Sequence, residues 1–442
     1  MKIQLSDHFG YAKLLRFTLP SIAMMIFTSI YGVVDGLFVS NFVGKTEFAA
    51  VNFVYPLIMM LGTIGFMFGT GGSALIAKTM GEGEDKKANE LFSLLVYIPF
   101  LLGVAVAAVA FVFIRPIVSL MGAEGELLEH SLTYGRILLL GLPALVLQFE
   151  FQSFFVTAEK PQLGLFVTVG AGVANMVGDA LLTAVFPLGI TGAAIATVSS
   201  QVIGGFVPLL YFVRKNTSRL KLGRAPFDGK ALLKATANGS SELMSNISMS
   251  LVSMLYNIQL IKYAGENGVA AYGVLMYVNF VFVALFIGFA VGSAPIFSYH
   301  YGAGNSFELK SLLGKSIGIN LIASVIMAAA ALLLARPLSG MFVGYDAELF
   351  EMTVRGFMIS AFSYIFSGLA IFGSSFFTAL NNGLVSAVIS FLRTLVFQIG
   401  AVMLLPLIFG IDGIWLSIVV AEFIAAAVSI IFILALKPKY KY

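Results

Sequence analysis

The stretch LFSLLVYIPFLLGVAVAAVAFVFI, residues 91–114, runs for 24 residues without a charged side chain. A helix that crosses the hydrocarbon core of a bilayer needs about 20 mostly apolar residues. A strand of a membrane barrel would instead alternate apolar and polar residues over about ten positions, which this stretch does not do. We infer that residues 91–114 form a transmembrane helix.

The composition of the whole chain agrees with this inference. Of its 442 residues, 59% are hydrophobic and 11% are charged, whereas soluble domains average about 45–50% and about 25%. A soluble enzyme, a nucleic-acid binder and a disordered scaffold are therefore excluded. The chain has no cysteine and three histidines, so we expect no cofactor, disulfide framework or protein metal cage.

Eleven further stretches have the same character and predict an all-α, polytopic membrane protein with twelve transmembrane helices. The predicted spans are residues 17–43, 48–77, 91–114, 132–157, 163–186, 190–213, 235–263, 269–297, 312–335, 353–380, 384–409 and 411–436.

The distribution of lysine and arginine predicts the orientation of these spans. With twelve spans, both termini lie on one side of the membrane, and that side holds nineteen basic residues against six on the other. Loops rich in lysine and arginine stay on the cytoplasmic side. We expect a multi-pass protein of the cell's inner (cytoplasmic) membrane with both termini in the cytoplasm.

The Arg115-Pro116 pair that follows the opening stretch recurs 221 residues later as Arg336-Pro337. The same offset relates many other residues of the two halves. Gly71, Gly81, Ser153, Thr157, Gly189 and Gly192 fall on Gly292, Gly302, Ser374, Thr378, Gly410 and Gly413. One fixed offset across the chain indicates an internal duplication.

The duplication predicts two six-helix lobes, residues 1–213 and 235–442, joined by a basic cytoplasmic linker at 214–234. Because each half has an even number of spans, the repeats enter the membrane in the same direction and ligand sites tend to lie between them. This architecture is typical of an alternating-access carrier. A channel and a membrane-embedded enzyme are the rivals, but no catalytic constellation is evident, so we expect a protein that is not an enzyme.

Ionisable residues inside spans are costly and are functional candidates by default. Asp35 and Asp179 each lie eight residues from the outer end of a span, about 12 Å deep. Asn175 is one helical turn before Asp179, and Thr197 of the next span reaches a similar level. These four residues predict a cation or proton site that Na⁺ can also occupy. The alternative is that they only bond helices together.

Four other residues carry weaker predictions. Arg393 and Glu422 lie on adjacent spans at similar depth and predict a structural ion pair in the second lobe. Glu150 has no evident partner and either faces a substrate cavity or lies buried. Pro20 interrupts the first span fifteen residues before Asp35 and can act as a hinge that couples Asp35 to the shape of the helix. Glu242 is close to the basic linker, which favours an interfacial position.

Several motifs resemble the multidrug and toxic compound extrusion (MATE) family over essentially the whole chain. They are residues 33–39 (VVDGLFV), residues 71–77 (GGSALIA) with Gly81, Asn175-x-x-x-Asp179, and residues 292–303 (GSAPIFSYHYGA). The family usually has Gln and Asn where this chain has Ala294 and His300.

The resemblance implies two six-helix bundles in a V-shaped carrier. It would export organic cations or other xenobiotics in exchange for H⁺ or Na⁺. Its substrates would be amphipathic small molecules, and it would work as a monomer. In the DinF-like and MepA-like branches the ion site lies in the first lobe, which maps onto Asp35, Asn175, Asp179 and Thr197. The same superfamily contains lipid-linked oligosaccharide flippases, which are the alternative function.

Overall fold

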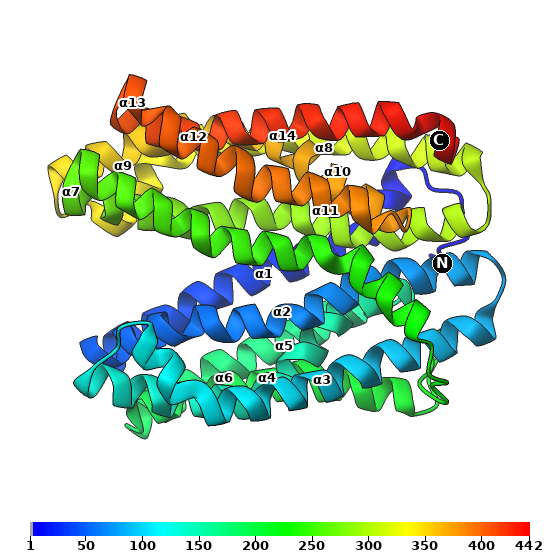
Figure 1. Ribbon diagram of the computed structural model, residues 1–442, viewed down its shortest axis with the longest axis horizontal. Coiled ribbons are helices and arrows are strands. Elements are labelled where there is room, and N and C mark those ends of the chain that lie inside the picture. Colours follow the sequence, from blue (N-terminus) through cyan, green and yellow to red (C-terminus); the bar gives the residue numbers. More distant parts are fainter. Residues whose placement is uncertain (1–2) are drawn as a thin grey trace.

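The computed structural model describes residues 3–442 (Figure 1), apart from the side chains of a few residues. The positions concerned are Val33, Gly36, Leu37, Val39, Ser40, Asn41, Lys45 and Ser250. Met1 and Lys2 lie outside the described part, and only the backbone is described for four residues of the 33–39 motif. All regular elements of the described residues are helices.

The first lobe consists of six long helices. They are α1 (Tyr11–Phe42), α2 (Lys45–Gly81), α3 (Asp85–Leu120), α4 (Gly125–Thr157), α5 (Pro161–Asp179) with the π-helical turn η1 (Ala180–Val185), and α6 (Gly189–Val213). The predicted stretch at residues 91–114 lies inside α3 and has many exposed apolar side chains, including Leu101, Val109 and Val112. A lipid-facing position accounts for this exposure.

The second lobe begins with α7 (Gly229–Gly302), which is continuous for 74 residues by its hydrogen bonding. A straight helix of that length would measure about 110 Å, far more than a bilayer. Gly265, however, has φ 60° and ψ −150°, a conformation that turns the chain back and that favours glycine. The helix is therefore two spans, and the eleven apolar helices of the described residues provide twelve crossings.

The remaining elements of the second lobe are partly segmented. They are α8 (Ser306–Val343), α9 (Ala347–Ser360), η2 (Ala361–Ser363), α10 (Tyr364–Ala379), α11 (Gly383–Phe391), the π-helical turn η3 (Leu392–Phe397), α12 (Gln398–Leu404), α13 (Pro406–Phe409) and α14 (Ile411–Tyr440). The two halves of the chain form two layers in Figure 1, and both termini lie at one end, here named the terminal end. The opposite end is named the distal end.

The apolar cores show how the lobes meet. One cluster joins both lobes and both chain ends, and contains Leu5, Phe68, Phe297 and Tyr442. Farther from the termini the core divides into one cluster within the second lobe, around Trp415, and another within the first. The lobes are therefore packed together at the terminal end and separate toward the distal end.

Glycines bring the lobes into backbone contact at the terminal end. A Cβ atom at Gly239 of α7 would overlap the carbonyl oxygen of Met67 in α2, and one at Gly71 would overlap that of Ala235. Gly81 and Gly302 have the same relation to the main chain of the other lobe. Only glycine permits such close approach, so these four positions hold the terminal end closed.

Candidate functional site

Asp35, Asn175 and Asp179 come together inside the first lobe, as the sequence predicts. The carboxyl group of Asp35, from α1, faces the side chains of Asp179 and Asn175, which lie in the last turns of α5. Asp179 is 0% and Asn175 is 1% exposed. Two ionised carboxylates this close would repel each other, so a proton or a cation between them stabilises the site.

These side chains have unused hydrogen-bonding capacity. Among the described residues, Asp35 Oδ1, both carboxylate oxygens of Asp179 and both side-chain polar atoms of Asn175 are buried without a hydrogen-bond partner. Buried polar atoms in proteins are normally paired. An arrangement of unpaired oxygens is suited to receiving a proton or a partly dehydrated Na⁺, for which carboxylate and amide oxygens are suitable ligands.

Thr197 is less directly involved than predicted. Its hydroxyl donates to the carbonyl oxygen of Ala193 in its own helix, at 3.0 Å, and it also lies against the hydroxyl of Tyr134. Tyr31 lies one helical turn before Asp35 and contacts Gln148. Neither tyrosine is among the site residues predicted from the sequence, although the four-residue spacing of Tyr31 and Asp35 places them on one face of α1.

The helix carrying Asp179 changes its winding directly after that residue. The π-helical turn η1 begins at Ala180, and the Thr183 hydroxyl donates to the main-chain oxygen of Asp179 at 2.5 Å. In the second lobe, Arg393 lies inside the other π-helical turn, η3. Single π turns within α-helices are frequent at functional sites because they reorient side chains.

Pro20 lies within α1, which continues through it from Tyr11 to Phe42. Its neighbours on the helix pack on the second lobe, where Gly292 contacts Thr18 and Gly288 contacts Ile22. The residue that sequence analysis proposes as a hinge is thus next to the contact between lobes. Its hinge role stays a prediction.

Of the two positions left open for Glu150, the structure shows the buried one. Its side chain is 0% exposed, and neither carboxylate oxygen has a hydrogen-bond partner among the described residues. It belongs to the first-lobe interior, where its main chain packs closely on Gly69 of α2. The helical rotation of α4 points Ser153, and not Glu150, at the cavity described next.

A cavity of about 420 Å³ lies between the lobes. Among the described residues, the first lobe contributes uncharged side chains, namely Met25, Thr28, Ser29, Phe66, Thr70, Ser73 and Ser153. The second lobe contributes most of the wall, including Met249, Tyr256, Tyr272, Phe280 and Trp415. Large apolar and polarizable side chains with scattered hydroxyl and amide groups are suited to varied amphipathic ligands.

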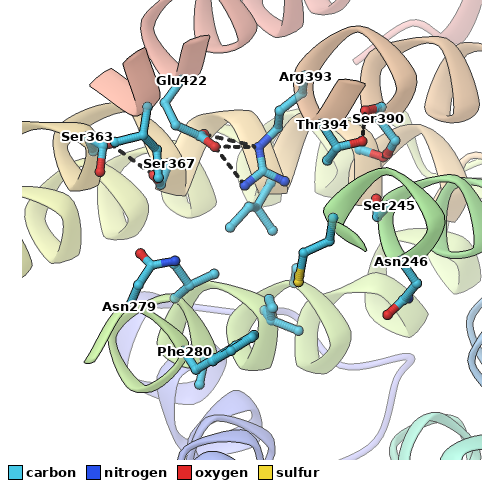
Figure 2. Close-up of a pocket in the computed structure, with 18 of the residues that line it drawn as sticks. Ser245, Asn246, Asn279, Phe280, Ser363, Ser367, Ser390, Arg393, Thr394 and Glu422 are labelled. Carbon is cyan, nitrogen blue, oxygen red and sulfur yellow. Dashed lines mark hydrogen bonds and ion pairs between the residues drawn. The ribbon is translucent and has the colours of Figure 1, made fainter. Parts of the chain in front are cut away.

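The cavity also contains the ion pair predicted in the second lobe. Arg393 Nε lies 3.0 Å from each carboxylate oxygen of Glu422, and Nη2 lies 3.0 Å from Oε1. Figure 2 shows this pair above the open space, with Asn246, Asn279 and Phe280 on the other side. Glu242 also lines the cavity, whereas the sequence analysis placed it at the membrane interface.

Removing one partner of this pair is expected to destabilise the fold more than removing both charges. Arg393→Gln leaves the Glu422 carboxylate buried and unpaired, which costs about 3–5 kcal/mol. We therefore expect a clearly lower Tm for Arg393→Gln and recovery of most of that loss in Arg393→Gln/Glu422→Gln. Thermal unfolding of the purified variants measures both, and equal Tm values for the single and double variants would contradict the prediction.

Two six-helix lobes, a cavity between them and a separate buried carboxyl site define a polytopic membrane protein built for moving small molecules. The chain belongs to the MatE family, because the family model matches residues 20–181 and again residues 243–404. The double match also confirms the internal repeat expected from the 221-residue offset.

Known proteins resemble the chain along nearly its whole length. The multidrug export protein MepA of Staphylococcus saprophyticus is 22% identical over 434 residues, covering 96% of this chain and 94% of the relative. MepA of Staphylococcus aureus is 22% identical, with 97% and 94% covered. The resemblance to MATE transporters of the MepA-like branch, predicted from the sequence motifs, is therefore confirmed.

Solved structures share the fold. An outward-facing multidrug resistance MATE transporter of the MOP superfamily has a TM-score of 0.93 at 22% identity, with 98% of this chain and 97% of that chain covered. A MOP superfamily transporter from Pyrococcus furiosus, described as having reversed polarity in its binding pocket, has a TM-score of 0.91 at 22% identity, with 98% of each chain covered.

Proposed function

We propose that the chain is a multidrug efflux antiporter, which exports amphipathic small molecules in exchange for H⁺ or Na⁺ by alternating access. The observation that supports it best is the pairing of Asp35 with Asp179 in a buried site whose polar atoms lack partners. The relatives named as multidrug export proteins support the same cargo class.

The cycle would use two separate sites. With the terminal end closed, the first-lobe site takes up the ion from the distal side, and the cavity releases its cargo there. When the terminal end opens, the ion leaves and new cargo enters. This proposal places the termini in the cytoplasm and the protein in the cytoplasmic membrane, where it would work as a monomer.

The energetics limit how cationic cargo is moved. Each 100 mV of membrane potential contributes about 2.3 kcal/mol per inward charge, which corresponds to about fiftyfold concentration of a neutral substrate. A cation exchanged one for one gains nothing from the potential. It would need a chemical ion gradient or a second coupling ion.

The flippase alternative is not favoured by the cavity. A lipid-linked sugar carries a pyrophosphate, which calls for several cationic groups. The ionisable side chains that line this cavity in the described part of the chain are two acids and one base, so the cavity has one cationic group and a formal charge of −1.

Reconstituted protein tests the proposal directly. In proteoliposomes with ethidium as cargo, an imposed pH gradient or an imposed Na⁺ gradient, each alone, is expected to reveal which ion drives saturable uphill accumulation. Vesicles without protein and vesicles with protein but no gradient are the controls. Passive equilibration under both gradients would mean a channel and would overturn the antiporter.

A further inference from the structure

The charges of the cavity are all on one wall. Glu242, Arg393 and Glu422 are the ionisable side chains that line it in the described part of the chain, and all three belong to the second lobe. Two negative groups and one positive group leave this wall with a formal charge of −1. Which ligand this wall can bind therefore depends on the hydrogen bonds and ion pairs that the three side chains already make.

Arg393 has N–H groups that are not bonded to Glu422. A guanidinium has five N–H groups, and Glu422 engages only Nε and Nη2. Among the described side chains, Arg393 makes no other hydrogen bond or ion pair. The side chain is 18% exposed, and Figure 2 shows one terminal nitrogen turned away from Glu422. This nitrogen can bind an anionic group without breaking the ion pair.

Glu242 offers the opposite charge. Its main-chain oxygen accepts from Asn246 Nδ2 at 2.9 Å, but its carboxylate makes no ion pair with a described residue. It is close enough to Arg393 for the two charges to interact. The stacked rings of Tyr256 and Tyr272, with centroids 5.0 Å apart, line the same lobe's wall and provide a flat apolar surface.

We propose that the second-lobe wall selects cargo that carries both signs of charge on an aromatic body, with a carboxylate at the free N–H groups of Arg393 and a cationic nitrogen at Glu242. This proposal rests on the proposed function and specifies its substrate class. Glu422 then acts as a positioning residue, because its two hydrogen bonds fix the guanidinium so that the remaining donors face the cavity.

Two dyes separate this proposal from simple cation binding. Rhodamine B carries a cationic xanthylium and a carboxylate, and its ethyl ester carries the same cation without the carboxylate. We expect the full-length protein in lipid nanodiscs to bind rhodamine B about tenfold more tightly than the ester, since a hydrogen bond between charged groups is gained. Fluorescence anisotropy, corrected with empty nanodiscs, measures both affinities.

The neutralised pair Arg393→Gln/Glu422→Gln should remove this preference, so that the two affinities agree within about twofold. Glu242→Gln should weaken both dyes together. The matched control is Arg336→Gln/Glu351→Gln, which removes an exposed ion pair elsewhere in the second lobe and should keep the tenfold difference.

Each outcome has one meaning. Equal affinities in the wild type, or a preference that persists in Arg393→Gln/Glu422→Gln, would overturn the two-charge proposal. If the ester is bound and driven uphill by an ion gradient, the antiporter proposal stands even then. If neither dye nor ethidium is moved by any gradient, the proposed function itself fails.

Discussion

Asp35→Asn and Asp179→Asn are each expected to reduce gradient-driven efflux strongly. An amide has nearly the shape of a carboxyl group but can neither accept a proton nor carry a charge. Typical coupling free energies of 1–3 kcal/mol correspond to about 5- to 150-fold effects on a linked equilibrium. We therefore expect gradient-driven accumulation of ethidium to fall by about this factor in either variant.

The separation of the two sites sharpens this test. Neither aspartate lines the cavity, so dye affinity should change little while the response to the gradient falls strongly. Asp412→Asn is a matched control, because it makes the same chemical change at a carboxylate paired with Arg355. Gradient-driven efflux at the wild-type rate in both aspartate variants would contradict the site assignment.

Gly239→Ala is expected to shift the protein away from the state with a closed terminal end. The added methyl group would overlap the Met67 carbonyl oxygen of the other lobe, and overpacking typically costs about 1–3 kcal/mol. That cost changes a two-state population ratio by about 5- to 150-fold. Efflux should fall because one of the two alternating states is depleted.

Spin labels can report this shift, since the chain has no native cysteine. Labels at Glu126→Cys and Glu348→Cys, near the starts of α4 and α9, are exposed and lie in different lobes. In Gly239→Ala their separation should shorten as the distal end closes. Gly314→Ala, in open space on α8, is the control, and identical distance distributions in the two variants would refute the prediction.

Much of the fold follows from the sequence because the bilayer imposes it. Apolar runs such as residues 91–114 identify spans wherever unpaired backbone groups cannot face lipid. The 221-residue offset predicts two equivalent lobes, and the family match at two corresponding segments agrees with it. The break in α7 at Gly265 also falls between two predicted spans.

The sequence predicts where the spans lie but not how each helix is rotated about its axis. Depth alone suggests Asp35, Asn175 and Asp179, which the structure brings together, but it cannot tell whether Glu150 faces a cavity or the protein interior. Packing of α4 on α2 decides that point. The π-helical turns η1 and η3 have no evident sequence signal. The predicted interfacial position of Glu242 is wrong, because distance along the chain from the linker does not determine what a side chain faces.

The described ionisable residues of the cavity all belong to the second lobe, and this placement has an evolutionary consequence. Substitutions that change cargo recognition can accumulate there without altering the ion site proposed in the first lobe. Under selection by a new toxic compound, gain-of-resistance changes should therefore cluster among the second-lobe positions that line the cavity, from α7 to α14. Duplication of an ancestral half would have made such specialisation available.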